Sequence, residues 1–370
     1  MVETVLVTGG TGFVAGWCII ELLRRGYVVR TTVRSLSKET AVRTAVASAT
    51  DASDRLTFFA ADLTRDEGWD AALAGCDYVL HVASPLGGDV SRDPNALVAP
   101  ARDGSLRVLR AAAKAGVKRV VMTSAAAAAR PPHGSDRVSD ETVWADPTDR
   151  QFDAYRRSKI LAERAAWDFM AGNTGPTTLA TILPGAVFGP LLMRENLGSV
   201  QIIDRLLQGR PAGLPRLGFW VVDVRDLADL QIRAMTAPKA AGERFIAAGD
   251  FMWMEDIAKT LRSKLGDRAV KVPTRRLPDV VVRFLSLFIP LLRSLTPSLG
   301  RKNSLTSAKA RRLLGFSPRP ATTTIVDCAE SLLDRARPGR ISGHDLPAAD
   351  IPRDHAAGPD HCAVADCHAG

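Results

Sequence analysis

Cysteine is scarce in this chain. Its five cysteines among 370 residues are odd in number and irregularly spaced, which argues against a disulfide framework and fits a reducing compartment. The first residues enter an apolar strand without a basic-then-apolar leader, so the sequence does not predict secretion. We therefore expect a cytoplasmic protein.

Long apolar runs are also missing. The most apolar late stretch, Val280 to Leu295, is interrupted by Arg283, Pro290 and Arg293, and it falls short of the roughly 20 apolar residues of a membrane helix. The formal net charge is +9, but the basic residues are spread along the chain among acids. We therefore expect no membrane span and no nucleic-acid partner.

A glycine-rich turn follows the first apolar run. Val2 to Val7 predicts a strand, and Trp17 to Arg25 has helical spacing. A strand, a glycine turn and a helix form the required context of a dinucleotide-binding fingerprint. Gly9 permits the tight turn, Gly12 lets a pyrophosphate approach the backbone, and the small Ala15 lets the helix pack on the strand.

Acidic residues are absent between Glu21 and Glu39, where an NAD-selective site would carry an acid for the ribose hydroxyls. The second strand, Tyr27 to Val33, instead ends on Arg34, and Lys38 follows. An arginine at this position accommodates a 2′-phosphate, so the sequence favours NADP(H) over NAD(H).

Strands and helices alternate through the first 190 residues, which predicts an α/β fold with a Rossmann-type, doubly wound parallel sheet. Its ligand is expected at the carboxyl ends of the strands. Helical periodicity appears in several later segments, and further strands follow the same apolar pattern. The predicted helices are Pro94–Ala115, Phe152–Phe169, Ser199–Leu207, Val224–Ala237 and Met254–Leu265, and the predicted strands are Leu56–Ala60, Tyr78–Ala83, Arg119–Thr123, Thr178–Leu183 and Trp220–Val224.

The pattern predicts three parts: a dinucleotide-binding domain over 1–190, a smaller and irregular substrate-binding region over 191–337 that interleaves with the first near 220–237, and a disordered tail over 338–370. The tail carries His361, Cys362, Cys367 and His368, but no flanking core would fix them. We therefore predict no metal site.

Tyrosine is rare, and Tyr155 is the single one of three that has a lysine, Lys159, four residues on. Residues at this spacing share one face of a helix. A tyrosine with an ordinary pKa of about 10 is a poor proton donor at neutral pH unless a nearby ammonium stabilises its phenolate. Chance pairing on a solvated helix face is the simpler alternative, and the upstream glycine turn argues against it.

With these motifs in place, the sequence resembles the extended short-chain dehydrogenase/reductase superfamily, known also as the NAD-dependent epimerase/dehydratase family. Within it, the resemblance is to the branch of dihydroflavonol reductases, cinnamoyl-CoA reductases and aldehyde and ketone reductases. It covers residues 2–335. The segments that match the family are Val7–Gly16, Thr31–Ser35, His81–Pro85, Val117–Ala125, Tyr155–Lys159, Leu183–Pro190 and Val222–Leu230.

The resemblance implies a role for each matching residue. Tyr155 would give a proton to a carbonyl oxygen, and Lys159 would lower the pKa of the tyrosine and bind the nicotinamide ribose. Ser124 is the catalytic serine candidate. The implied cofactor-binding residues are Gly9, Thr11, Gly12, Phe13, Val14, Arg34, Lys38, Asp62, Leu63, Val82, Ala83, Ser84, Thr123, Tyr155, Lys159, Pro184, Gly185 and Val187.

One departure concerns the end of the fifth strand. The family's usual Thr-Ser-Ser is Thr123-Ser124-Ala125 here, so an alanine stands where the second serine would orient the substrate oxygen. Either Ser124 or Thr123 takes the role, or another donor or a water does, or catalysis is slow.

The leading hypothesis is an NADP(H)-dependent oxidoreductase that reduces a hydrophobic or aromatic aldehyde or ketone, or oxidises the corresponding alcohol. The alternatives are a nucleotide-sugar epimerase or dehydratase, which Arg34 disfavours, and a non-catalytic NADP(H)-sensing protein, which Ala125 favours. The sequence leaves the substrate, the reaction direction and the oligomeric state open; a homodimer is compatible with it.

Overall fold

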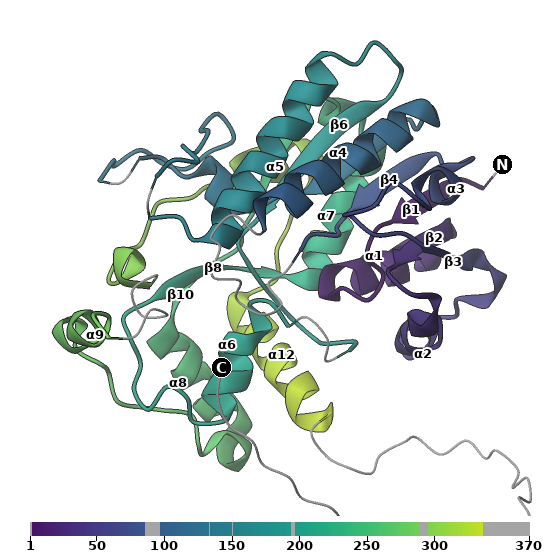
Figure 1. Cartoon of the computed structure of the whole chain (residues 1–370). Helices are drawn as coiled ribbons and strands as arrows, with labels where there is room; N and C mark the ends of the chain where they lie inside the picture. Colours follow the sequence, from purple (N-terminus) through teal and green to yellow (C-terminus); the bar gives the residue numbers. More distant parts are fainter. Residues whose placement is uncertain are drawn as a thin grey trace, which may run out of the picture. The chain divides into compact units, whose positions relative to one another are not determined.

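A seven-stranded parallel sheet forms the centre of the protein (Figure 1). The computed structural model describes residues 2–85, 97–132, 134–149, 151–193, 197–288 and 295–335. The strand order is β3-β2-β1-β4-β5-β6-β9. These strands are β1 (Thr4–Val7), β2 (Val28–Val33), β3 (Leu56–Ala60), β4 (Tyr78–His81), β5 (Arg119–Thr123), β6 (Thr178–Pro184) and β9 (Glu243–Ala247).

The chain reverses its direction of travel across the sheet between β1 and β4. It moves outward from β1 through β2 to β3, and then returns to β4 beside β1 and continues to β9. Val7 of β1 is therefore aligned with Thr31 on one side and Leu80 on the other. Ligands of open α/β sheets bind at such a switch point, outside the carboxyl ends of the strands.

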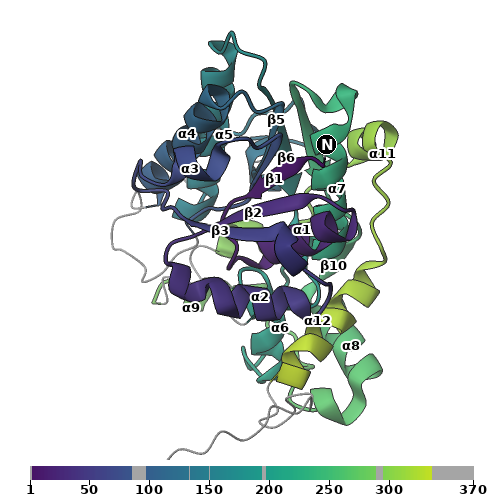
Figure 2. The same cartoon turned by 90° about the vertical axis from the view of Figure 1, so that its right-hand side faces the viewer.

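Helices cover both faces of this sheet (Figure 2). The helices of the described residues are α1 (Phe13–Arg24), α2 (Glu39–Ala47), α3 (Trp69–Leu73), α4 (Val98–Lys114), α5 (Ala154–Ala171), α6 (Val200–Leu207), α7 (Val224–Thr236), α8 (Met254–Leu265), α9 (Asp279–Leu285), α11 (Ala308–Leu314) and α12 (Ala321–Arg335). On one face α1 packs against α7, and on the other α4 packs against α5.

Apolar burial fixes these two layers. Ile19 and Leu23 of α1 lie in one core cluster with Leu227 and Leu230 of α7, and all four are buried. A second cluster on the opposite face joins α3, α4 and α5 to the sheet. The predicted α/β fold with a doubly wound parallel sheet is confirmed.

A smaller mixed sheet with the order β10-β8-β7 lies in the second half of the chain. Its strands are β7 (Ala186–Phe188), β8 (Gly218–Asp223) and β10 (Phe251–Trp253), with β7 parallel and β10 antiparallel to β8. Helices α6, α8 and α12 share a third apolar cluster with it. Residues Met1–Arg335 form one compact unit, so the division near residue 190 stays a prediction.

Most predicted elements are present, and their differences from the prediction have local causes. The predicted strand Tyr78–Ala83 ends at His81, because the backbone N–H groups of Val82 and Ala83 donate to the Thr8 hydroxyl oxygen and not to a neighbouring strand. The predicted helix Trp17–Arg25 begins earlier, at Phe13, since Gly12 already has the extended backbone of an N-cap. The first residues of the predicted helix Pro94–Ala115 lie outside the described residues.

The sequence pattern did not reveal β7, β9, β10, α2, α3, α11 or α12. The missed strands have three to five residues, too few for a period to show. In the described residues, no helix is long and apolar enough to cross a membrane. The tail with His361, Cys362, Cys367 and His368 lies outside the described residues.

Candidate active site

The glycine turn lies at the carboxyl edge of the sheet, between β1 and α1. Gly9 has a φ of +75°, which favours glycine, and a Cβ there would lie 3.0 Å from the Cβ of Ala83. Helix α1 has no side-chain hydrogen bond at its N-cap, Gly12. Its first backbone N–H groups therefore face the edge without a capping side chain, which is the arrangement that binds a phosphate group.

A buried polar network that the sequence analysis missed braces this turn. The Thr8 hydroxyl oxygen accepts hydrogen bonds from the backbone N–H groups of Val82 (3.1 Å) and Ala83 (3.0 Å). Thr8 Oγ1 also lies 3.0 Å from His81 Nδ1, and His81 Nε2 lies 3.1 Å from Ser105 Oγ. Burial lowers the pKa of His81 to about 3, so the imidazole is neutral. The network holds the β4 edge against the glycine turn.

Arg34 lies exposed directly after β2. Within the described residues its guanidinium makes no hydrogen bond or ion pair, while Lys38 lies four residues on. After β3, Asp62 Oδ1 accepts from the Thr64 backbone (2.8 Å) and hydroxyl (2.7 Å), and these bonds lower the pKa of the carboxyl group. Arg34, which also lowers that pKa, is therefore near Asp62 at the same edge.

Tyr155 and Lys159 lie in the first turns of α5. Asp153 caps this helix, since its Oδ1 accepts from the backbone N–H of Arg156 at 2.8 Å. The ammonium of Lys159 is buried and donates to the carbonyl oxygen of Thr123 at 3.0 Å, which ties the helix to the end of β5.

Burial shifts the pKa of both groups. It lowers the pKa of Lys159 to about 8, against the opposing effect of Glu163, and it raises the pKa of Tyr155 to about 12, with a further contribution from Asp153. The tyrosine is therefore a neutral phenol at neutral pH. The lowered pKa that the resemblance implies for Tyr155 is not found, because burial disfavours the phenolate.

Ser124 belongs to a buried ionic cluster. Its hydroxyl donates to Glu163 Oε2 at 2.6 Å, and Thr181 donates to Glu163 Oε1 at 2.8 Å. Arg244 of β9 completes the cluster, with its Nε 2.9 Å from Glu163 Oε1 and its guanidinium 3.7 Å from the ring centre of Trp144. The Ser124 hydroxyl is thus already engaged, which argues against a catalytic role, although that role stays a prediction.

Thr123 and Ala125 flank Ser124. Thr123 Oγ1 donates to Gln231 Oε1 at 3.2 Å, and the buried Gln231 Nε2 has no hydrogen-bond partner among the described residues. Ala125 has an extended backbone, with φ −153° and ψ 150°, and precedes a short 3-10 helix, η3 (Ala126–Ala129). In the described residues near Tyr155, the place of the family serine therefore holds only a methyl group.

Comparison with known proteins places the chain in a family. The model of the NAD dependent epimerase/dehydratase family matches residues 5–248. A ketoreductase, azaE, of Aspergillus niger is 32% identical over 91% of this chain and 99% of its own length. Cinnamoyl-CoA reductase CAD2 of Medicago truncatula is 40% identical over 65% of this chain and 74% of its own length.

A solved structure shows the same relationship. Yeast methylglyoxal/isovaleraldehyde reductase Gre2, complexed with NADPH, superposes with a TM-score of 0.76 at 25% identity, covering 90% of this chain and 99% of that chain.

The chain belongs to the NAD dependent epimerase/dehydratase family.

Within this family it lies in the branch of reductases that includes dihydroflavonol and cinnamoyl-CoA reductases, as the sequence predicts. It is an NAD(P)-dependent oxidoreductase.

The segment Pro184–Val187 connects the two sheets of this oxidoreductase. The backbone N–H of Gly185 donates to the carbonyl oxygen of Ala247 at 3.0 Å, and a Cβ on Gly185 would lie 2.3 Å from the carbonyl oxygen of Trp220. Only glycine therefore fits here without a backbone shift. The turn brings Pro184, Gly185 and Val187 to the carboxyl edge of β6, although their contact with a nicotinamide stays a prediction.

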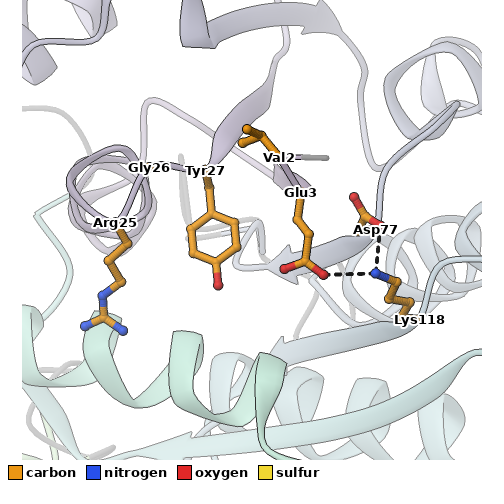
Figure 3. A pocket seen from close by; sticks show the side chains of 7 residues that line it. All are labelled: Val2, Glu3, Arg25, Gly26, Tyr27, Asp77 and Lys118. Carbon is orange, nitrogen blue, oxygen red and sulfur yellow. Dashed lines mark hydrogen bonds and ion pairs between the residues drawn. The ribbon is translucent and has the colours of Figure 1, made fainter.

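A hollow of about 410 Å³ lies at the opposite edge of the sheet (Figure 3). Its lining residues directly precede β1, β2, β4 and β5, so it faces the amino ends of the strands. Lys118 Nζ is paired there with Glu3 (2.9 Å) and Asp77 (3.0 Å). Because these charges satisfy one another and lie at the far edge from Tyr155, we place the chemistry at the carboxyl edge.

Proposed function

We propose that this oxidoreductase uses NADP(H) to reduce a hydrophobic or aromatic aldehyde or ketone to the alcohol. The observation that carries the proposal is the Tyr155/Lys159 pair, held on α5 at the end of β5 and at the edge where the glycine turn lies. The reductase names of the relatives support the reaction class.

The residues at this edge fit a dinucleotide. The uncapped N-terminus of α1 suits the pyrophosphate, with Thr11 to Val14 along it. Arg34 favours the 2′-phosphate of NADP(H), because its guanidinium is exposed and has no partner within the described residues. Lys38 would add a second cation four residues on.

The nicotinamide, when bound, supplies the hydride. Tyr155 holds the proton that the carbonyl oxygen takes up, and Lys159 carries the positive charge that stabilises the resulting phenolate. The hydrogen bond to the Thr123 carbonyl oxygen fixes the position of the Lys159 ammonium, so this position does not depend on a contact with Tyr155. Around them, the η3 alanines Ala128 and Ala129 are buried beside Phe152, which favours an apolar substrate.

A non-catalytic NADP(H)-sensing protein is the second candidate, and Ala125 is the observation that favours it. Without a serine hydroxyl at this position, Tyr155 is the remaining donor that the resemblance assigns to the substrate oxygen. A sensor would bind the cofactor but turn nothing over.

The test is oxidation of NADPH and NADH by the purified protein with a panel of aldehydes and ketones, run beside Tyr155→Phe. We expect turnover that prefers NADPH and falls about 10²–10⁴-fold in the variant, since a positioned proton donor contributes about that much. Cofactor affinity should change much less than turnover, because phenylalanine keeps the ring and loses only the hydroxyl group. Binding of NADPH without turnover across the panel would favour the sensor.

A further inference from the structure

Arg130 is a half-buried cation at the end of η3. Its guanidinium carbon lies 5.9 Å from the ring centre of Phe152, a residue three positions before Tyr155 in the chain. Within the described residues this guanidinium makes no hydrogen bond and no ion pair. Its donors therefore have no acceptor in the part of the chain that the structure describes, and burying a charge without one is costly.

The charges that face Arg130 do not compensate it. Burial first, and then the nearby Arg156 and Arg301, lower the pKa of Arg130, while Asp149 opposes them. A guanidinium nevertheless keeps its charge at any physiological pH. Asp149 Oδ1 already accepts from the backbone N–H of Gln151 at 2.9 Å.

The other nearby acid is engaged as well. Asp153 caps α5 and pairs with Arg156 at 3.4 Å. The neighbourhood of Arg130 therefore has an excess of positive charge that an anion from outside would balance.

A hollow of about 370 Å³ opens beside the same segment. It is lined by Gln151, which adjoins Phe152, and by Arg283 of α9, together with Ser286, Thr296 and Pro297. Arg283 adds a further cation to this side of the protein. Through Gln151 the hollow therefore adjoins the segment of Phe152 and Tyr155, and the Phe152 ring contacts Arg130.

We infer that Arg130 binds an acidic oxygen group of the substrate, a carboxylate or a phosphate, while the carbonyl group of the same molecule lies at Tyr155. The substrate class is then an apolar or aromatic aldehyde or ketone that carries one such anionic group. The planar guanidinium donates two parallel hydrogen bonds to either group, and the Phe152 ring supports the apolar part. This inference rests on the proposed reductase function.

The test compares matched substrates and a matched variant. The substrates are 4-formylbenzoate, its neutral methyl ester and 4-formylphenyl phosphate, and the variants are Arg130→Gln and Arg137→Gln. Arg137 is an exposed arginine of the same segment, whose Nη2 donates to Thr142 Oγ1 at 2.9 Å. The two anionic substrates show whether a carboxylate or a phosphate suits the site.

We expect Arg130→Gln to lower kcat/KM for an anionic substrate by about tenfold to a hundredfold, mainly through KM, and to leave the ester nearly unchanged. Arg137→Gln should change neither. If the wild type does not prefer an anionic substrate to the ester, or if Arg130→Gln affects both equally, the inference is wrong.

A binding measurement separates this inference from the reductase proposal. Calorimetry with benzoate and with phenyl phosphate on the NADP⁺-loaded protein requires no turnover. If the protein has no reductase activity but binds these anions, and Arg130→Gln abolishes that binding, the anion site stands and the proposed function is wrong. If the protein turns over neutral carbonyls in a Tyr155-dependent way but binds neither anion, the proposed function stands and the anion site is wrong.

Discussion

At the scale of single residues, the end of β5 decides how well this oxidoreductase can stabilise a developing oxyanion. Ser124 donates to Glu163, Thr123 donates to Gln231, and Ala125 offers no donor. The two hydroxyl groups next to the family position are therefore directed into the core. If Tyr155 is the proton donor, as we propose, the side chains of these three residues add no second donor for the oxyanion.

Restoring a hydroxyl at residue 125 tests this conclusion. Ala125→Ser should raise kcat by about tenfold or more, because a preorganised donor to an oxyanion contributes about 10²–10³ elsewhere and a newly placed one recovers part of that. The extended backbone at Ala125 accepts serine without strain. Steady-state kinetics measures the change, with Ala127→Ser as the control. An unchanged kcat would mean that another donor already acts.

Glu163 controls the charge of Lys159, one helical turn away. Its carboxylate is buried and raises the pKa of Lys159, which burial lowers to about 8. His81 from β4 also lies near Lys159, and Arg244 from β9 pairs with Glu163 at 2.9 Å. If activity requires the ammonium, it should decline as the pH rises through about 8.

Glu163→Gln should move this alkaline decline to lower pH by about one unit, since removal of a nearby opposite charge destabilises the ammonium. The amide oxygen can still accept from one of the two hydroxyl groups, Ser124 or Thr181, and the amide NH2 can donate to the other. The pH profile of kcat/KM measures the shift. Glu141→Gln is the control, because Glu141 accepts from the Ile246 backbone N–H and belongs to the same cluster around Arg244. An equal shift in both variants would contradict the argument.

At the scale of elements, the β6–β7 turn joins the large sheet to the small one. Gly185 bonds to β9 through its backbone and touches the backbone of β8. The turn therefore has contacts in both sheets, and its backbone cannot move without disturbing them. We therefore expect a substitution in this turn to affect both the stability of the fold and binding at the carboxyl edge.

Gly185→Ala should lower the free energy of unfolding by about 1–3 kcal/mol, because the new Cβ overlaps the Trp220 carbonyl oxygen and forces a backbone shift. If the turn contacts the nicotinamide, the Kd for NADPH should rise as well. Urea denaturation and NADPH titration measure the two effects. Gly175→Ala is the control, since its Cβ would meet only an Asn173 side chain at 3.4 Å.

At the scale of the whole molecule, the parallel sheet gathers residues from distant parts of the chain. The ends of β1, β2, β3 and β4 bring Gly9, Arg34, Asp62 and Ala83 to one edge. A cofactor along this edge would contact many segments of the compact unit at once. Its binding should therefore stabilise the unit as a whole.

We expect NADPH at about 100 times its Kd to stabilise the fold by about 2.7 kcal/mol, or about 4 °C in Tm for a unit of this size. NADH at the same concentration should give a smaller shift, and Arg34→Gln should remove the difference. Differential scanning calorimetry measures all three. Equal shifts with both cofactors in the wild type would contradict the assignment of Arg34.

The sequence by itself determined the fold class and the sheet edge at which the candidate residues lie together. Glycines after a strand, alternating apolar runs and the four-residue spacing of Tyr155 and Lys159 are local patterns, and parallel strands bring their carboxyl ends together whatever the details. Bounds such as Leu56–Ala60 and Met254–Leu265 agree with the structure for the same reason.

Only the tertiary structure decided which partners each polar side chain finds. Ser124 meets Glu163 across 39 residues, and Thr8 meets His81 across 73, so no short-range pattern reveals either contact. Arg130 illustrates the opposite outcome, because in the sequence it is one arginine among many. That no described residue accepts a hydrogen bond from its guanidinium becomes visible only when the fold has half-buried it beside Phe152.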